Sequence, residues 1–253
     1  MVTVKDVYDY IDTIAPFSGQ LDFDNSGFLV GDPDRTVKNI AVSLDITSET
    51  IAGARECQAD LMVSHHPVIY KAKKNILKGD PVYELISSGI SAICAHTSLD
   101  CAVGGVNDVL AEIFGLEKVE ALPTNELPTP MIRVGFLPEP LTPYELAATA
   151  AEKLGSRLRW CDGGKPIETV AVCGGSGGSL VNDMIELQID ALITGDAGYH
   201  NFLDAEENGL TLIAAGHFET ENPVVPVLAE KLRSRFPDVT VAVLTQTVQE
   251  KRL

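Results

Sequence analysis

The chain has little positive charge and no long apolar segment. Its 253 residues include 19 Lys and Arg against 36 Asp and Glu, which gives a formal net charge of −17. Proteins that bind nucleic acids use Lys and Arg to neutralise phosphates, so this balance argues against nucleic acid as a direct partner. No apolar run approaches the roughly 18 residues of a membrane span, and the first residues show no signal-peptide pattern. We therefore expect a cytoplasmic protein with no membrane partner.

Paired cysteines are also missing. The five cysteines are an odd number, and no two of them form a C-x-x-C motif; they are Cys57, Cys94, Cys101, Cys161 and Cys173. This pattern argues against a disulfide framework and against a structural zinc knuckle. The apolar fraction of 45% instead predicts a globular chain that builds its cores from ordinary hydrophobic side chains.

Apolar runs of strand length alternate with segments of helical periodicity along the chain. Strands are predicted at 39–45, 59–66 and 90–100, and helices at 4–14, 48–58 (capped by Ser48), 80–89 and 104–115. Alternation of this kind is typical of βαβ units and a mostly parallel sheet. Three prolines in residues 122–131 predict a boundary or linker between two parts of the chain.

The second half of the sequence resembles the first. When residues 40–66 are shifted by 130 positions they fall on 170–196, and Ala41, Val42, Glu56, Gln58 and Asp60 meet identical residues. A shift of 120 positions places 89–95 on 209–215, with matches at Gly89, Ile93 and Ala95. We interpret this as an internal duplication with repeats at 1–122 and 123–253. The alternative is that any two βαβ units share this degree of similarity.

Four of the five histidines come just after the apolar part of a predicted strand. His65 and His66 come after 61–63, His96 after 90–95, and His217 after the corresponding strand of the second half. Ligands of open parallel sheets collect beyond the carboxyl ends of the strands. In "HTSLD" and "HFETE" a carboxylate lies four residues after the histidine, a spacing that places both on one face of a helical turn.

These residue types are typical ligands of divalent metals such as zinc, manganese, iron and nickel. Five nitrogen and oxygen ligands exceed the needs of one tetrahedral ion and suit two ions that share a carboxylate. We therefore predict a site for two divalent metal ions, whose ligands are His65, His66, Asp100, His217 and Glu221. Taken singly, His96 and His200 are as readily explained as structural histidines.

Four motifs in order, "SHHPVIY", "AHTSLD", "TGDAGYH" and "AGHFETE", resemble those of the GTP cyclohydrolase I type 2 homolog family, also described as NGG-interacting-factor-three-like dinuclear metal proteins. The resemblance implies two intertwined α/β repeats with the metal site between them, and the five ligands named above with Glu221 as the bridge. It also implies a homo-oligomer, commonly a toroidal hexamer. One departure is Phe23, where many members have tryptophan.

The expected activity is that of a metal-dependent hydrolase. A metal-bound hydroxide would attack a nucleotide or another small anionic, phosphorylated molecule, and His96 or His200 would transfer protons. The resemblance implies GTP cyclohydrolase chemistry, and a phosphoesterase is the nearest rival. The alternative from another class is a non-enzymatic metal-binding or regulatory scaffold, or a metallochaperone.

Other residues near the predicted site have two readings each. Asp45 and Asp196 either orient ligand histidines or cap helices. Lys71, Lys73 and Lys74 either attract an anionic substrate or form a solvated loop. Gly175, Ser176 and Gly177 either bind an anion through backbone amides or form a tight turn against the sheet.

Overall fold

The protein folds into two compact units. The computed structural model describes residues 1–125 and 129–246; unit 1 comprises residues 1–99 and those from 224 onward, and unit 2 comprises residues 100–223. The chain passes from unit 1 to unit 2 within α4 (Thr97–Cys101), and it returns between α9 (His217–Glu221) and α10 (Val224–Arg235). In the described ranges, no helix is long and apolar enough to cross a bilayer.

Unit 1 is built on a five-stranded sheet in the order β1-β4-β3-β2-β11. Four of its strands are parallel, and β1 is antiparallel to β4 at one edge. The strands are β1 (Gly27–Val30), β2 (Asn39–Ser43), β3 (Leu61–Ser64), β4 (Ser91–Cys94) and β11 (Thr240–Val243). Its helices are α1 (Val4–Ile14), η1 (Phe17–Gly19), α2 (Ser48–Glu56), α3 (Pro81–Ser88) and α10.

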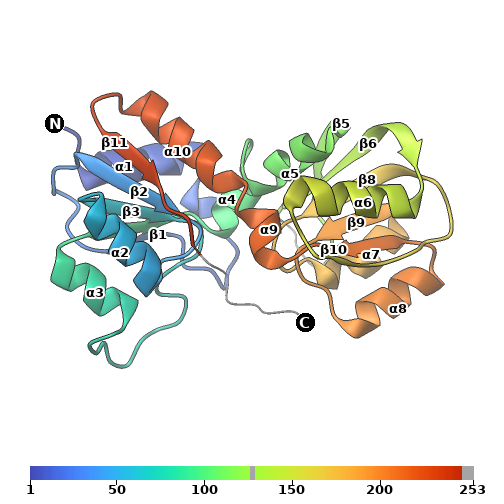
Figure 1. Ribbon diagram of the computed structural model, residues 1–253, viewed down its shortest axis with the longest axis horizontal. Helices are drawn as coiled ribbons and strands as arrows, with labels where there is room; N and C mark the ends of the chain where they lie inside the picture. Colours follow the sequence, from blue (N-terminus) through green and yellow to red (C-terminus); the bar gives the residue numbers. More distant parts are fainter. Residues whose placement is uncertain (126–128, 247–253) are drawn as a thin grey trace. The chain divides into compact units, whose positions relative to one another are not determined.

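Local sequence explains the helices of unit 1. α1 begins with a capping box between Thr3 and Asp6, and it buries Val4, Val7 and Ile11 at helical spacing. α3 begins at Asp80 and Pro81 and ends at Gly89, whose φ of +65° places it in the left-handed region that favours glycine. α2 and α3 cover one face of the sheet, and α1 and α10 cover the other (Figure 1).

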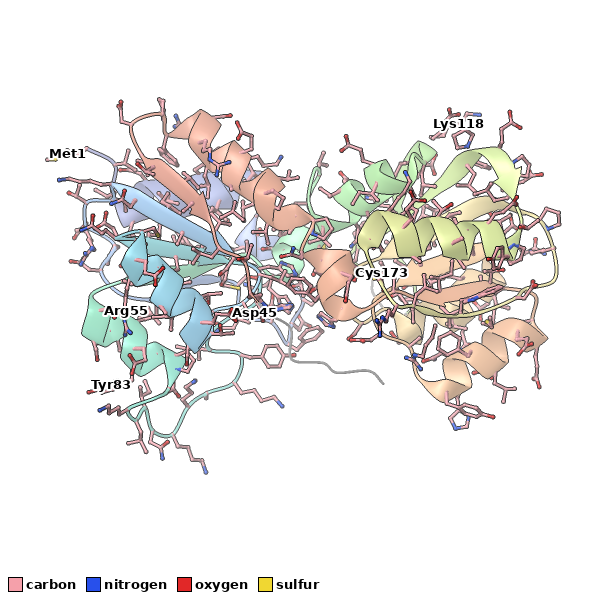
Figure 2. The ribbon with its side chains drawn as sticks, in the orientation of Figure 1. Met1, Asp45, Arg55, Tyr83, Lys118 and Cys173 are labelled. Carbon is pink, nitrogen blue, oxygen red and sulfur yellow. The ribbon has the colours of Figure 1, made fainter. Side chains whose placement is uncertain are left out.

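Unit 2 is built on a six-stranded sheet in the order β5-β6-β8-β9-β10-β7. The strands are β5 (Glu117–Leu122), β6 (Ile132–Leu141), β7 (Arg159–Cys161), β8 (Ile167–Cys173), β9 (Ala191–Thr194) and β10 (Thr211–Ala214). The helices are α5 (Val106–Phe114), α6 (Pro143–Leu154), η2 (Gly178–Leu180), α7 (Val181–Glu186) and α8 (Tyr199–Glu207). One core lies under α5 and α6, and the other lies under α7 and α8. Cys173 is buried in this unit, whereas Met1, Tyr83 and Lys118 extend from the surface of the protein (Figure 2).

The two sheets repeat the same pattern of strands at the predicted shifts. In unit 1, β3 residue Leu61 pairs with Ile40 and Ser91; in unit 2, Ala191 pairs with Val170 and Thr211. Each of these partners differs by the 130 or 120 positions seen in the sequence. β1 and β7 are likewise equivalent, because each lies antiparallel at the edge of its sheet. The predicted duplicated α/β fold is therefore confirmed, with mixed sheets.

Each repeat gives its last helix and strand to the sheet of the other repeat. α5 and β5 follow β4 in the chain, yet α5 packs on β6 and β8, and β5 pairs with β6 in unit 2. In the same way α10 and β11 follow the strands of unit 2, and β11 pairs with β2 in unit 1 (Figure 1). The compact units therefore have limits that differ from the repeat limits at residue 122.

Three local expectations differ from the structure. The strand predicted over 90–100 ends at Cys94, because Thr97 begins the short helix α4. Thr47 caps α2 in place of Ser48, since its hydroxyl accepts the amide of Thr50. The proline-rich segment 122–131, of which 126–128 lie outside the described residues, joins the antiparallel neighbours β5 and β6 within unit 2 and is no boundary between units.

Candidate metal centre

Three histidines gather at the carboxyl ends of β3 and β4 in unit 1. His65 and His66 directly follow β3, and His96 lies two residues beyond β4. Each offers a ring nitrogen, and these atoms lie within 4.8 Å of one another. The ring centroids are 4.9 to 5.4 Å apart. Such a cluster of imidazoles is suited to binding a divalent metal ion.

Each of these rings is held through its Nδ1 atom. The Nδ1 of His65 donates to the carbonyl of Ala95 at 2.9 Å, and that of His66 donates to Asp45 at 2.7 Å. His96 donates to Asp24, also at 2.7 Å. An oxygen acceptor at Nδ1 fixes the tautomer that presents the Nε2 lone pair to a metal. Asp45 therefore orients His66, and α2 takes its cap from Thr47.

Asp24 is the residue of this group that the sequence did not reveal. Its carboxylate also accepts the amide and hydroxyl of Thr97 and the hydroxyl of Ser26. Burial alone would raise the pKa of Asp24, but the hydrogen bonds from His96, Thr97 and Ser26 outweigh burial and hold this pKa well below its usual range. The carboxylate is therefore ionised, as an acceptor for His96 requires. Asp24 and His96 are 72 residues apart, so no local pattern links them.

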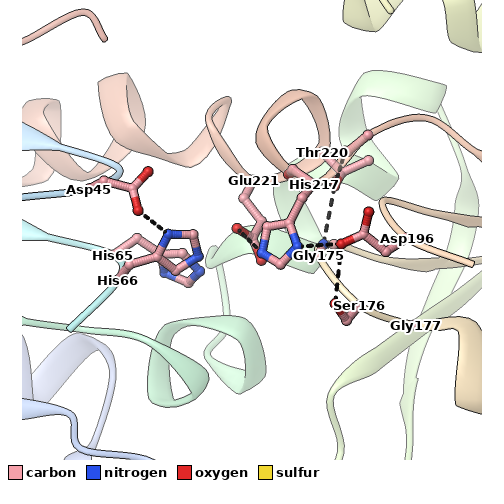
Figure 3. A network of polar contacts seen from close by, with 12 residues as sticks. Asp45, His65, His66, Gly175, Ser176, Gly177, Asp196, His217, Thr220 and Glu221 are labelled. Carbon is pink, nitrogen blue, oxygen red and sulfur yellow. Dashed lines mark hydrogen bonds and ion pairs between the residues drawn. The ribbon is translucent and has the colours of Figure 1, made fainter. Parts of the chain in front are cut away.

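Unit 2 brings together two carboxylates and one histidine. Asp100 lies on α4 and Glu221 on α9; both are 3% exposed, and each has a carboxylate oxygen within 4.8 Å of the other's. The Nε2 of His217 lies 3.1 Å from Glu221, and its Nδ1 donates to Asp196 at 2.7 Å (Figure 3). Asp196 thus contacts a predicted ligand histidine in the same way as Asp45. It does not cap α8, whose N-cap residue is Gly198.

Two buried carboxylates this close are a suitable environment for a cation. Like charges repel strongly where water is excluded, and a bound divalent ion relieves that repulsion. Their field also acts on Cys173: burial raises the pKa of this thiol, and the charges of Asp100 and Glu221 raise it further. Carboxylate oxygen and imidazole nitrogen together match the donors of borderline divalent metals. The residues present therefore fit the predicted metal.

The glycine loop after β8 gives space to Glu221. A Cβ built on Gly175 would lie 2.1 Å from the Glu221 Oε1, and φ at this glycine is +64°. The amides of Gly175 and Gly177 donate to the hydroxyls of Thr220 and Thr194, so they are engaged within the protein. Ser176 donates to Asp196 at 3.3 Å. This geometry is that of a tight turn packed against the helix that carries Glu221.

The other predicted residues lie apart from these clusters. His200 is an exposed residue at the start of α8 with its ring beside Tyr199. It belongs to none of the groups of metal ligands found in the described parts of the chain. Lys73 forms an ion pair with Asp80, the cap of α3. Lys71 and Lys74 are exposed in the loop that follows His66.

Comparison with known sequences places the chain in a family. The family model described as Duf34/NIF3 (NGG1p interacting factor 3) matches residues 2–251. The chain belongs to the NIF3 family. It is 35% identical to a GTP cyclohydrolase 1 type 2 homolog of Clostridium acetobutylicum, over 90% of this chain and 89% of that protein. It is 34% identical to the homolog of Clostridium perfringens, over 92% of each chain.

Solved structures share the fold of this chain. A Bacillus cereus protein related to NIF3 superposes with a TM-score of 0.90 at 20% identity, covering 100% of this chain and 99% of that one. Reduced HcgD from Methanocaldococcus jannaschii gives a TM-score of 0.84 at 26% identity, covering 97% and 98%. The NIF3 fold is thus matched along the whole length of the chain.

Proposed function

We propose that this protein binds two divalent metal ions and uses them to hydrolyse a nucleotide or another phosphorylated small molecule. One observation carries the proposal: the three predicted ligand imidazoles, on His65, His66 and His217, all have Nδ1 bonded to an oxygen acceptor. Metal-ligating histidines generally donate their other ring N–H to such an acceptor, which directs the Nε2 lone pair toward the ion. The buried carboxylates of Asp100 and Glu221 supply the negative charge that the ions need.

The two units carry complementary donors. Unit 1 contributes imidazoles, and unit 2 contributes two carboxylates and one imidazole. We infer that both sets bind the same two ions, with Glu221 as the bridge. The path of the chain supports this inference, because Asp100 is the first residue of unit 2 and Glu221 lies three residues before the return to unit 1 at Val224. Both carboxylates therefore lie where the chain passes between the units.

The chemistry follows from the donors. Two bound divalent ions would act as Lewis acids on a phosphoryl or carbonyl oxygen and would lower the pKa of water. His96, held at Nδ1 by the ionised Asp24, is suited to accept a proton at Nε2 and return it to a leaving group. Lys71 and Lys74 are exposed in the loop that follows His66, in a chain of net charge −17, and they would attract an anionic substrate.

The name of the relatives suggests the first substrate to test. Curated relatives are called GTP cyclohydrolase 1 type 2 homologs. GTP is an anionic nucleotide, which agrees with the proposed class, and phosphoesters form the next panel. By the resemblance of the family we also propose a ring-shaped homo-oligomer, which native mass spectrometry of the purified protein would measure directly.

Metal content is the decisive first measurement. Protein purified without chelator should hold two divalent ions per chain by elemental analysis. His66→Ala and Glu221→Gln should each lose metal, because each removes a direct donor. His200→Ala is the matched control, since it removes an exposed histidine outside both clusters and should leave the content unchanged. A wild-type protein that takes up no divalent ion contradicts the proposal.

Turnover separates the enzyme from the alternative. Metal-loaded protein should consume GTP or a member of a phosphoester panel, with release of formate or phosphate as the readout. His96→Gln should retain metal and lose rate, because it removes the proton carrier. If the protein holds both ions and hydrolyses none of the panel, the metal-binding scaffold or metallochaperone becomes the better description.

A further inference from the structure

The two buried carboxylates are carried by helices too short to hold themselves in place. α4 and α9 have five residues each. Helices of this length are unstable in isolation and take their position from tertiary contacts. The separation of Asp100 and Glu221 must therefore be fixed by residues outside these two helices.

Asn107 lies between the two carboxylate-bearing segments. This side chain on α5 is completely buried. Its Nδ2 donates to the backbone carbonyl of Asp100 at 3.2 Å, and its Oδ1 accepts the amide of Gly174 at 2.8 Å. The next amide, that of Gly175, donates to the hydroxyl of Thr220 at 3.1 Å, and Thr220 is the neighbour of Glu221. Three hydrogen bonds and the backbone between Gly174 and Gly175 thus connect the backbone of Asp100 to the helix of Glu221.

Arg133 holds the turn that follows Asp100. This side chain on β6 is 3% exposed, and its Nη2 donates to the carbonyls of Cys101 and Ala102 at 3.0 and 3.1 Å. Its Nε donates to Asp108, whose second oxygen accepts the amide of Gly104 at 2.6 Å. Residues 101–104 are therefore fixed on both sides, by a buried guanidinium and by the carboxylate that pairs with it.

We propose that Asn107 sets the separation of the Asp100 and Glu221 carboxylates and that Arg133 fixes the orientation of Asp100. Both are positioning residues for the ion that the two carboxylates bind, so the inference rests on the proposed metal site. Loss of the Asn107 carboxamide frees α4 from the loop that carries the amides of Gly174 and Gly175. The two carboxylates then adopt a range of separations, and the affinity for the ion falls.

The first test is a titration of chelator-treated protein with Co²⁺, followed by the visible absorption of the bound ion. Asn107→Ala should weaken Co²⁺ binding about 10- to 100-fold and change the absorption bands, as is typical when residues that orient metal ligands are removed. Arg133→Lys keeps the charge beside Asp108 but cannot bond both carbonyls. It should lose less Co²⁺ affinity than Arg133→Ala. Its partial rescue relative to Arg133→Ala distinguishes orientation from charge.

Thr211→Val is the matched control. Thr211 is completely buried in unit 2, and its hydroxyl accepts the amide of Gly163. This variant loses a partly buried hydrogen bond away from the carboxylates, so it should lower the melting temperature and leave the Co²⁺ spectrum unchanged. If Asn107→Ala behaves like Thr211→Val, the proposed role is overturned.

A second readout does not depend on metal. In chelator-treated protein, hydrogen exchange should speed up in both 100–105 and 217–222 for Asn107→Ala, because one carboxamide restrains both segments. Unchanged exchange in the second segment would overturn the coupling. A wild-type protein that binds no Co²⁺ refutes the proposed function alone, since exchange still decides the role of Asn107.

Discussion

The two copies of the βαβ repeat share a framework and differ in chemistry. Asp60 accepts the backbone amides of Lys38 and Asn39 and an ion pair from Arg35. Shifted by 130 positions, Asp190 accepts the amides of Glu168 and Thr169 and an ion pair from Lys165. Gln58 and Gln188 even share a positive φ, of 52° and 56°. The duplication is thus retained down to single hydrogen bonds.

The residues that follow the strands, in contrast, differ between the two copies. His65 and His66 of the first copy correspond to Gly195 and Asp196 of the second, and Asp45 corresponds to Gly175. In the first copy Asp45 holds a histidine; in the second, the missing side chain of Gly175 leaves space for Glu221. The comparison teaches that the buried strand pairing and the aspartates that hold the strand starts, Asp60 and Asp190, restrict substitution, whereas the loops beyond the strands carry different polar residues in the two copies.

The largest expected effect comes from a substitution at Gly175, where the second copy makes space for Glu221. Gly175→Ala should cost roughly 2–5 kcal/mol of unfolding free energy and expel metal, because it adds left-handed strain and a clash with Glu221. Gly155→Ala is the control, since Gly155 has φ of +63° and open space around its Cβ position. It should cost only about 1–2 kcal/mol and leave metal content unchanged, as measured by denaturation and elemental analysis. Equal behaviour of the two variants would refute the assigned role of Gly175.

The next effect tests whether the two copies orient their histidines alike. Asp45→Ala and Asp196→Ala should each weaken metal binding about 10- to 100-fold, because each releases the Nδ1 of one histidine. Titration with a divalent ion measures this loss. Asp9→Ala removes an exposed carboxylate on α1 and should leave metal binding unchanged. A loss in one copy only would show that the other contact is incidental.

The two equivalent aspartates, Asp60 and Asp190, should respond equally to substitution. Asp60→Asn and Asp190→Asn should each lower the unfolding free energy by about 1–2 kcal/mol, since each weakens hydrogen bonds to a charged group that is partly exposed to water. Urea denaturation measures both variants. Unequal losses of unfolding free energy would mean that neighbouring contacts compensate for the loss of one of the two aspartates.

The contribution of Asp190 to the unfolding free energy should also depend on pH. Burial acts to raise the pKa of Asp190, but the ion pair with Lys165 and hydrogen bonds from Thr169 and Glu168 lower it below its ordinary value of 3.8. A lowered folded-state pKa contributes stability above pH 3.8 that is lost as pH falls through the folded-state pKa. The gap between wild type and Asp190→Asn should therefore be constant near neutral pH and shrink below about pH 4. A gap that widens in acid would contradict this assignment.

The smallest effect should be a gain. Gln58→Gly and Gln188→Gly remove left-handed strain at equivalent turns, and the higher chain entropy of glycine cancels part of that benefit. Each variant should gain roughly 0.5 kcal/mol of unfolding free energy, which a shift of the urea midpoint would report. A loss at either position would show that the glutamine side chain itself stabilises its turn.

Much of this arrangement was accessible from sequence because the central strands are buried on both faces. Runs such as 40–42 and 191–193 are apolar throughout, so the strands, their order in the chain and their equivalence under fixed shifts can be read from the sequence. Histidines directly after such runs indicate a site at the sheet edge. Local signals therefore sufficed for His65, His66, His96 and His217 to be singled out.

Partners distant in sequence remained hidden. Asp24 reaches His96, and Arg133 reaches Cys101, only through the folded sheet order. The exchange of α5 with α10 was implied only by the family resemblance, as intertwined repeats, and not by periodicity: an amphipathic pattern shows that a helix packs on a sheet, but not on which sheet. The proline-rich segment misled because proline signals a break in regular structure, and such a break occurs between paired strands as readily as between domains.

The exchange of helix-strand ends has a consequence for ancestry. A lone repeat of this design would carry a terminal helix and strand with no sheet of its own to join. The unit that was duplicated would therefore have been stable only as two identical chains that traded their ends. Fusion of that pair into one polypeptide released each half from having to be its own partner, which is the condition for the two ends of the gene to evolve separately.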